Sequence, residues 1–257
     1  MPGSVTPMPD TTELVHLEVA DGVATITLDS PHNRNALSRQ LVGELFERLE
    51  AADADDSVKA VVIRAEGKVF CSGADLSEAS ADGMEEGARG MVAMQRRIVA
   101  MGKPVVTRLH GAVRAGGIGI VAASDIAISA DDTTYALTEV KLGLAPAVIS
   151  LTVFPRLTSR AAALTCLSGE VFTGADAAEM GLVTRAVPSD GLDAAVDEVV
   201  ASLLTGAPQG LRETKALLTR DLLERIDAHG DEVAALSARL FGSDAAREAM
   251  LAFLSRR

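Results

Sequence analysis

The sequence predicts an α/β core followed by a helical C-terminal region. Short apolar segments with the length of buried strands alternate with helical segments as far as Pro146. Beyond Pro146 the periodicity is almost entirely helical. The composition agrees, because hydrophobic residues make up 48% of the chain while aromatic residues make up only 3%. This alternation predicts layered structure but does not distinguish a doubly wound sheet from other arrangements.

The first half of the chain contains most of the expected strands. The pair Asp21-Gly22, between two apolar runs, is typical of a tight hairpin turn. Ser38 is the expected N-cap of the first helix, Lys103-Pro104 ends the second, and glycine-rich residues 116–119 begin a third. We expect strands at 14–19, 23–28, 58–64, 105–109 and 125–129, and helices at 38–49, 91–101 and 116–123.

The last third of the chain is expected to be mainly helical. Neither an internal repeat nor a low-complexity linker marks a domain boundary there. Helices are expected at 159–167, 175–180, 192–204, 211–223 and 232–241, with one short strand at 182–187.

The charge balance and the cysteine content exclude several classes of protein. A formal net charge of −12 disfavours nucleic acid and anionic membranes, because phosphate binding needs clustered Lys and Arg. Charged residues interrupt every apolar stretch before the roughly 18 to 20 residues that a membrane span needs. Cys71 and Cys166 form no metal-ligand or disulfide pattern and indicate a reducing cytoplasm. Residues 1–12 lack the features of a signal peptide and are expected to be a flexible tail.

Several segments, in order and in spacing, resemble those of the enoyl-CoA hydratase/isomerase, or crotonase, superfamily. They are residues 30–37 (SPHNRNAL), 70–76 (FCSGADL), 103–125 with the glycine cluster, 138–143 (TEVKLG), 172–177 and 181–183. A lone glycine cluster is weak evidence, but the ordered set covers nearly the whole chain and is specific.

The resemblance implies a fold that periodicity alone does not predict. A spiral of repeated β-β-α units is expected over residues 13–195, followed by a helical region over 196–257. In this family the helical region mediates assembly into a homotrimer, often a dimer of trimers. The implied substrate is an acyl-CoA thioester, with coenzyme A as part of the substrate, no separate cofactor and no metal.

Acyl-CoA chemistry passes through enolate-like states, so negative charge on the thioester oxygen must meet prepositioned donors. By resemblance, these donors are the backbone amides of Ala74 and Gly116. The residue types agree, because Gly73 permits a sharp turn before Ala74, and Gly116 begins an apolar helix whose first amides carry positive potential. Taken singly, such glycines serve close packing more often than catalysis.

Glu139 is the expected catalytic carboxylate, because it matches one of the two glutamates of the hydratase acid/base pair. A carboxylate next to a buried thioester shuttles protons or activates water, particularly where desolvation raises its pKa. The alternative is a solvated Glu139 paired with Lys141. The second glutamate falls on Gly119, which has no side chain. His110 and Asp125 are expected to be structural.

The glycine at position 119 leaves three functions open. Residues 136–147 resemble bacterial hydratases similar to methylglutaconyl-CoA hydratase, which favours addition of water across the 2,3-double bond of an enoyl-CoA. The missing side chain at Gly119 favours a Δ3,Δ2-enoyl-CoA isomerase, in which Glu139 moves one proton between the α and γ carbons. A third interpretation is a catalytically weak acyl-CoA-binding protein.

Further residues are expected at the substrate by resemblance. His32 and Arg34 fall where family members bind the adenine and phosphates of coenzyme A, and Asp75 is expected to hold its own loop by hydrogen bonds. Arg114 replaces a usually apolar residue, and it either pairs with a second carboxylate on the acyl group or bonds to neighbouring carbonyl groups. The expected binding residues are His32, Arg34, Ala36, Ala74, Asp75, Leu76 and Arg114.

Overall fold

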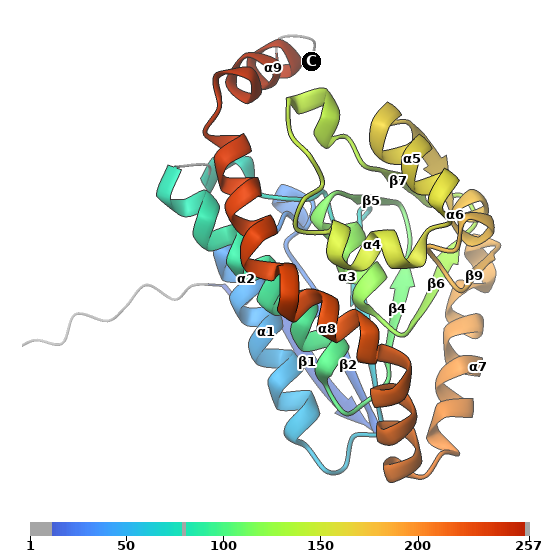
Figure 1. Cartoon of the computed structure of the whole chain (residues 1–257). Coiled ribbons are helices and arrows are strands. Elements are labelled where there is room, and N and C mark those ends of the chain that lie inside the picture. The colour runs from blue at the N-terminus through green and yellow to red at the C-terminus, as the bar shows by residue number, and fades with distance from the viewer. Residues whose placement is uncertain (1–11, 79–80, 255–257) are drawn as a thin grey trace, which may run out of the picture.

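Two β-sheets and the helices around them make up residues 12–78 and 81–254, which the computed structural model describes (Figure 1). The strands are β1 Val15–Ala20, β2 Val23–Leu28, β3 Ala60–Ala65, β4 Val105–Leu109, β5 Ala112–Arg114, β6 Ile126–Ala130, β7 Thr134–Ala136, β8 Val171–Thr173 and β9 Arg185–Val187. The helices are α1 Arg39–Ala54, α2 Ala81–Ala100, α3 Gly116–Ala123, α4 Ser150–Arg156, α5 Ser159–Ser168, α6 Gly174–Met180, α7 Leu192–Leu204, α8 Pro208–Phe241 and α9 Asp244–Leu254. Short 3₁₀ turns are η1 Pro31–Asn33, η2 Leu76–Glu78, η3 Glu139–Leu142 and η4 Ser189–Gly191.

The larger sheet follows the order of the chain, β1-β2-β3-β4-β6-β9. β1 and β2 form the predicted antiparallel hairpin around Asp21-Gly22, where φ is 49° and 83°, and the other strands pair in parallel. Each strand is therefore added at the same edge of the sheet, as in a spiral. A doubly wound sheet would instead reverse direction at a switch point. The smaller sheet has the order β5-β7-β8.

Alternate residues of the central strands face two different cores. Val61 and Ile63 of β3 pack into the main core, which also contains buried residues of α1, α2 and α3. Val62 points to the opposite face and packs with Val196 and Val200 of α7. Figure 1 shows the same division, with α1, α2 and α8 on one side of the sheet and α7 on the other. The expected boundary at residue 195 falls inside α7.

Cations satisfy the carbonyl groups that end α1, α2 and α3, where helices carry partial negative charge. Lys103 donates to the last turn of α1 at 2.7 Å, Lys215 to the last turn of α2 at 2.9 Å, and Arg156 to the last turn of α3 at 3.0 Å. Lys215 also lies 2.8 Å from Asp125, which ties α8 to the core. Asp125 accepts the amide of Val105 at 2.7 Å, so its predicted structural role is confirmed.

The C-terminal helices differ from prediction at one point. The helices expected at 211–223 and 232–241 are one continuous helix, α8. Gly230 allows close packing there, because a Cβ at this position would lie 2.9 Å from Val92 Cγ1 of α2. Contact with α2 thus stabilises α8 at Gly230, although glycine disfavours a helix in isolation. The sequence also did not predict α4, α9 or the short strands of the smaller sheet.

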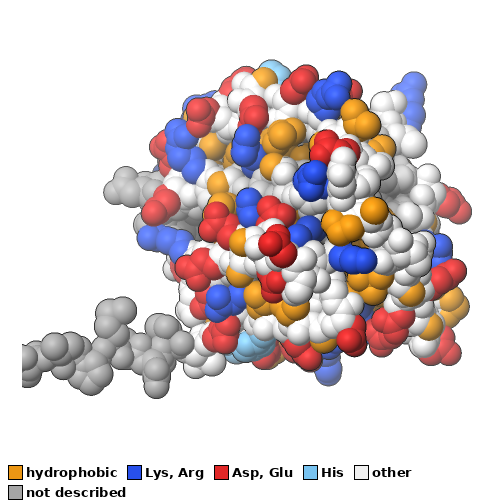
Figure 2. Space-filling model, turned by 90° about the horizontal axis from the view of Figure 1, so that it is seen from below, with side chains coloured by type: hydrophobic (Ala, Val, Ile, Leu, Met, Phe, Trp, Pro, Cys, Tyr) orange, Lys and Arg blue, Asp and Glu red, His pale blue; other side chains and the backbone are white. Residues whose placement is uncertain are grey.

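The molecular surface mixes charges of both signs. On the face shown in Figure 2, Lys and Arg side chains are interspersed with Asp and Glu, and the described part of this face has no large basic patch. None of the helices in the described ranges is long and apolar enough to cross a bilayer. Residues 1–11 of the expected tail lie outside the described residues.

Candidate active site

Two segments that are far apart in the sequence run side by side in parallel register. Cys71 and Val113 form an isolated parallel bridge, with hydrogen bonds of 3.0 and 3.3 Å between the two segments. Three residues further along each segment, the same register places Ala74 next to Gly116. Gly73 permits the close approach, since a Cβ there would lie 3.1 Å from a methyl group of the second segment, and its φ is +94°.

The amides of Ala74 and Gly116 have no hydrogen-bond acceptor within residues 12–78 and 81–254. The neighbours of Ala74 bond to Leu37 on both sides, so the N–H of Ala74 points away from that strand. Gly116 is the first residue of α3, where an amide has no intrahelical partner. Ala115 before it has φ 43° and ψ −114°, a strained conformation that orients the peptide group between the two residues. Both amides are therefore free to bind a ligand oxygen.

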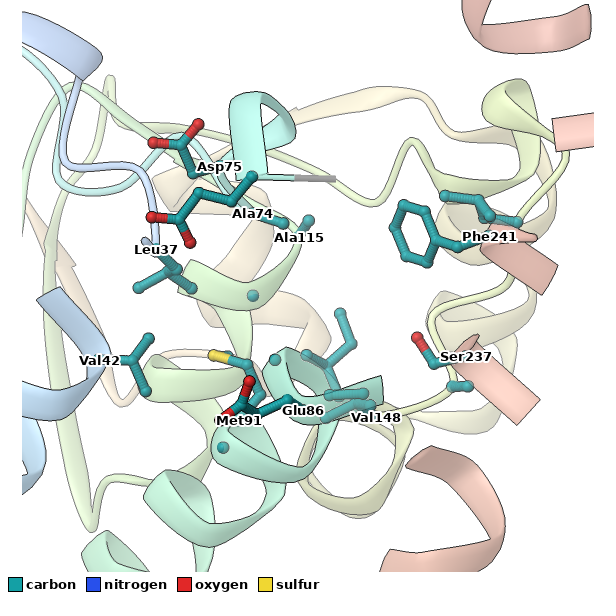
Figure 3. A pocket seen from close by; sticks show the side chains of 18 of the residues that line it. Leu37, Val42, Ala74, Asp75, Glu86, Met91, Ala115, Val148, Ser237 and Phe241 are labelled. Carbon is teal, nitrogen blue, oxygen red and sulfur yellow. The ribbon is translucent and has the colours of Figure 1, made fainter. Parts of the chain in front are cut away.

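Ala74 and Gly116 border a pocket of about 350 Å³, within the usual range of small-molecule sites (Figure 3). The walls come mainly from α1, α2, the segment 144–149 and the last turns of α8. Figure 3 shows Ser237 and Phe241 of α8 across the pocket from Val42 of α1. Most of the lining is apolar or glycine.

Glu139 begins η3 and lines this pocket. Its Oε2 is buried and has no hydrogen-bond partner among the described residues. Burial raises the pKa of Glu139 to about 7, which suits proton exchange near neutral pH. The expected alternative, a pair with Lys141, is not formed, because Lys141 Nζ donates to the carbonyl of Gly169 at 2.6 Å. Helix α9 packs closely against Gly143, the residue after η3, because a Cβ there would lie 3.0 Å from Ala245 O.

The space beside Gly119 is filled by other side chains. A Cβ there would lie 2.7 Å from Ile149 Cγ2 and 3.2 Å from Gln95 Oε1. Gln95 is held in place, since its Oε1 accepts the Thr152 hydroxyl at 2.6 Å. The site thus has neither a second carboxylate at this position nor room for one.

Comparison with known proteins identifies the family. A family model described as enoyl-CoA hydratase/isomerase matches residues 18–257. The chain belongs to the enoyl-CoA hydratase/isomerase family. The crystal structure of an enoyl-CoA hydratase from Mycobacterium avium is 47% identical, with a TM-score of 0.90 over 96% of this chain and 98% of that one. The predicted crotonase-like fold is therefore confirmed.

Relatives of the chain carry names from more than one reaction class. A hydroxycinnamoyl-CoA hydratase-lyase of Pseudomonas fluorescens is 31% identical over 78% of this chain and 76% of its own length. A peroxisomal Delta(3,5)-Delta(2,4)-dienoyl-CoA isomerase of Arabidopsis thaliana is 28% identical over 96% of this chain and 95% of its own. Membership of the hydratase/isomerase family thus leaves the reaction of this member undecided.

The loop that the family resemblance assigned to coenzyme A lies outside the pocket lining. His32 and Arg34 are both exposed, and neither lines the pocket. Two asparagines that the sequence analysis did not single out hold the loop. Asn33 donates to the carboxylate of Asp75 at 3.2 Å, and Asn35 donates to two backbone carbonyl groups at 3.0 and 2.8 Å.

Three further predicted binding residues lie next to Ala74 in the chain or on the segment paired with it. Asp75 lines the pocket and accepts the amide of Ser77 at 2.9 Å and its hydroxyl at 2.7 Å. These hydrogen bonds lower the pKa of Asp75, and they confirm that it holds its own loop. Ala36 is buried beside the pocket residue Leu37, and Leu76 begins η2.

Arg114 is not among the described residues that line the pocket, and its contacts match the alternative that it bonds to neighbouring carbonyl groups. Its guanidinium donates to the carbonyl and hydroxyl of Thr134 at 2.5 and 3.0 Å, and to the carbonyl of Val113 at 3.0 Å. A half-buried guanidinium needs acceptors, and the neighbouring strand β7 supplies them. His110 is likewise structural, with Nε2 lying 2.9 Å from the carbonyl oxygen of Gly67.

Proposed function

We propose that this chain is an enoyl-CoA hydratase in which Ala74 and Gly116 bind the thioester oxygen and Glu139 makes every proton transfer. The observation that carries the proposal is the buried Oε2 of Glu139, which has no partner in the part of the chain that the structure describes and shares a pocket with those two residues. Buried polar atoms nearly always have a partner, so this oxygen is suited to hold a reacting water. The hydratase names of relatives at 47% and 31% identity also support hydration.

A single carboxylate suffices for this reaction. Ionised Glu139 accepts a proton from water while the water oxygen bonds to C3 of the enoyl group. The electrons of the double bond move onto the thioester oxygen, where the amides of Ala74 and Gly116 stabilise the enolate. Such a donor typically contributes roughly 3 to 4 kcal/mol. Protonated Glu139 then returns the proton to C2, and the 3-hydroxyacyl-CoA leaves an enzyme in its starting state.

A second candidate function is a Δ3,Δ2-enoyl-CoA isomerase. Ile149 fills the space beside Gly119, so the site has no second carboxylate there to share in orienting a water. Isomerisation needs only one carboxylate: ionised Glu139 removes a proton from C2 of a 3-enoyl thioester and returns it to C4. The same two amides would stabilise the dienolate that forms between these steps.

Product mass and chromatographic retention together distinguish the two reactions. The enzyme is incubated separately with 2-octenoyl-CoA and 3-octenoyl-CoA, and the products are separated by liquid chromatography and analysed by mass spectrometry. Hydration adds the mass of one water to the 2-enoyl thioester, whereas isomerisation converts the 3-enoyl thioester without a change in mass. Glu139→Gln should abolish either reaction. Full activity of this variant would contradict the proposal.

We also propose that the chain assembles as a homotrimer or a dimer of trimers. Large apolar side chains on α5 and β8 support a contact surface, since Leu164, Leu167 and Val171 are 51%, 76% and 62% exposed. Sedimentation equilibrium measures the oligomer directly, and a monomer at micromolar concentration would contradict this proposal.

A further inference from the structure

The glycines that line the pocket are of two kinds. Gly116 of α3 is required by packing, because a Cβ there would lie 2.6 Å from Leu37 Cδ1. By contrast, a Cβ on Gly43 of α1 or Gly87 of α2 would have no described atom within 4 Å apart from its own helix backbone and chain neighbours. Gly90 of α2 would make only an ordinary contact, at 3.8 Å. Packing within the described chain therefore does not explain the glycines of α1 and α2.

Glycine inside a helix is costly, so a glycine that packing does not need keeps space open for something else. Gly87 and Gly90 lie in the interior of α2, about one turn apart, and both face the pocket. With Gly43 they line the side of the pocket that α1 and α2 form, which we call the groove. Ser237 and Phe241 of α8 line the pocket across from Val42 of α1 (Figure 3).

The charges on the pocket lining disfavour an acidic acyl group. Asp75, Glu78 and Glu86 line the pocket together with Glu139, and Arg39 is the cation among the described lining residues. Arg39 is already paired, since its guanidinium lies 3.5 Å from Glu86 and 4.0 Å from Glu78. A carboxylate on the ligand would meet repulsion and no free cation within this described lining.

We propose that the pocket selects a medium-chain, uncharged acyl group, which lies along Gly43, Gly87 and Gly90 and ends against Phe241. This inference rests on the proposed function, because it takes the pocket as the acyl site of an acyl-CoA enzyme. The volume agrees: about 350 Å³ corresponds to about a dozen waters at roughly 30 Å³ each, whereas a crotonyl thioester has only about half that number of heavy atoms.

Binding of unreactive saturated thioesters tests the inference without turnover. Isothermal titration calorimetry compares octanoyl-CoA, butyryl-CoA and glutaryl-CoA on the wild-type protein. Octanoyl-CoA should bind at least about tenfold more tightly than butyryl-CoA, because its additional methylene groups leave water. Glutaryl-CoA should bind more weakly than butyryl-CoA, because its second carboxylate loses hydration without gaining a partner.

Two substitutions close the groove. Gly43→Leu and Gly87→Leu place a side chain in the open space and favour the helix, so the midpoint of thermal unfolding should not fall. Each should weaken octanoyl-CoA binding by about tenfold and leave butyryl-CoA binding within about twofold. Gly210→Leu is the matched control, since Gly210 is helical, has open space at its Cβ position and lies outside the pocket. It should change none of the affinities.

Equal affinity of the wild type for octanoyl-CoA and butyryl-CoA would overturn the inference. Chain-length selectivity that survives both groove substitutions would do the same, as would tight binding of glutaryl-CoA. Failure of the proposed function would give a different set of results from failure of this inference. Selective binding with no turnover of any enoyl-CoA contradicts the enzymatic proposal alone, while turnover without selectivity contradicts the acyl-group inference alone.

Discussion

Replacing Glu139 with glutamine should stabilise the protein at alkaline pH relative to wild type, although it removes the catalytic group. Burial raises the pKa of Glu139 from its ordinary 4.5 to about 7. Between these two values the folded chain keeps a proton that the unfolded chain has released. The free energy of unfolding of the wild type therefore falls as pH rises through this interval, and glutamine, which does not titrate, escapes that loss.

The size of this loss in unfolding free energy follows from the difference between the two pKa values of Glu139. A step from 4.5 to about 7, at about 1.4 kcal/mol per pH unit, corresponds to about 3 kcal/mol. The loss begins as pH passes 4.5 and is complete once pH exceeds about 7. About 2 kcal/mol of it falls between pH 5.5 and pH 8.5.

Urea unfolding at pH 5.5 and pH 8.5 measures this effect, with the variant and wild type compared at each pH. The stability difference between variant and wild type should shift by about 2 kcal/mol in favour of the variant at the higher pH. Glu50→Gln, on the exposed face of α1, controls for the loss of one negative charge. A difference between Glu139→Gln and wild type that stays constant with pH would refute the burial of this carboxyl group.

Further substitutions test other parts of the site and the fold. The kcat/KM for an enoyl-CoA should rise with pH and reach half of its plateau value near pH 7, because ionised Glu139 is the base. A flat profile from pH 5.5 to 8.5 would contradict this role. Gly116→Ala should lower kcat by about 10²-fold to 10³-fold in steady-state assays, since the added methyl group has no room and displaces the amide; an unchanged kcat would exclude that amide as a donor. Arg114→Met should leave the ratio of kcat/KM for neutral and dicarboxylic enoyl-CoA unchanged, and a loss confined to the dicarboxylic substrate would show that the side chain does reach the acyl group. Lys215→Met should lower the free energy of unfolding in urea by about 3 kcal/mol, because the partly buried Asp125 would lose its cation; a loss below about 1 kcal/mol would contradict this.

Local signals in the sequence predicted much of the fold. The turn at Asp21-Gly22 and the cap at Ser38, whose hydroxyl accepts the amide of Leu41 at 3.2 Å, depend on only a few neighbouring residues. The continuity of α8 through Gly230 and the direction of Arg114 depend instead on packing against α2 and β7. Such long-range contacts leave no periodic signal in one sequence.

The candidate site likewise has features that the sequence predicted and features that depend on long-range packing. The resemblance pointed to Glu139 and to the amide of Gly116, and the structure brings these residues to one pocket, while their chemical roles stay predictions. The filling of the space beside Gly119 by Ile149 could not be predicted, since it depends on how α3 and the segment before α4 pack together. Ser237 and Phe241 were not predicted as pocket residues; they are four residues apart on α8 and so share a helical face, but what that face contacts depends on packing.

The most direct test is a crystal structure of the Glu139→Gln variant with 2-octenoyl-CoA bound. We predict a thioester oxygen about 2.7 to 3.1 Å from the amide nitrogens of both Ala74 and Gly116, with the side chain of residue 139 facing C2 of the acyl group. A thioester oxygen bound away from these amides, or a side chain at position 139 turned away from the acyl carbons, would contradict the proposed chemistry.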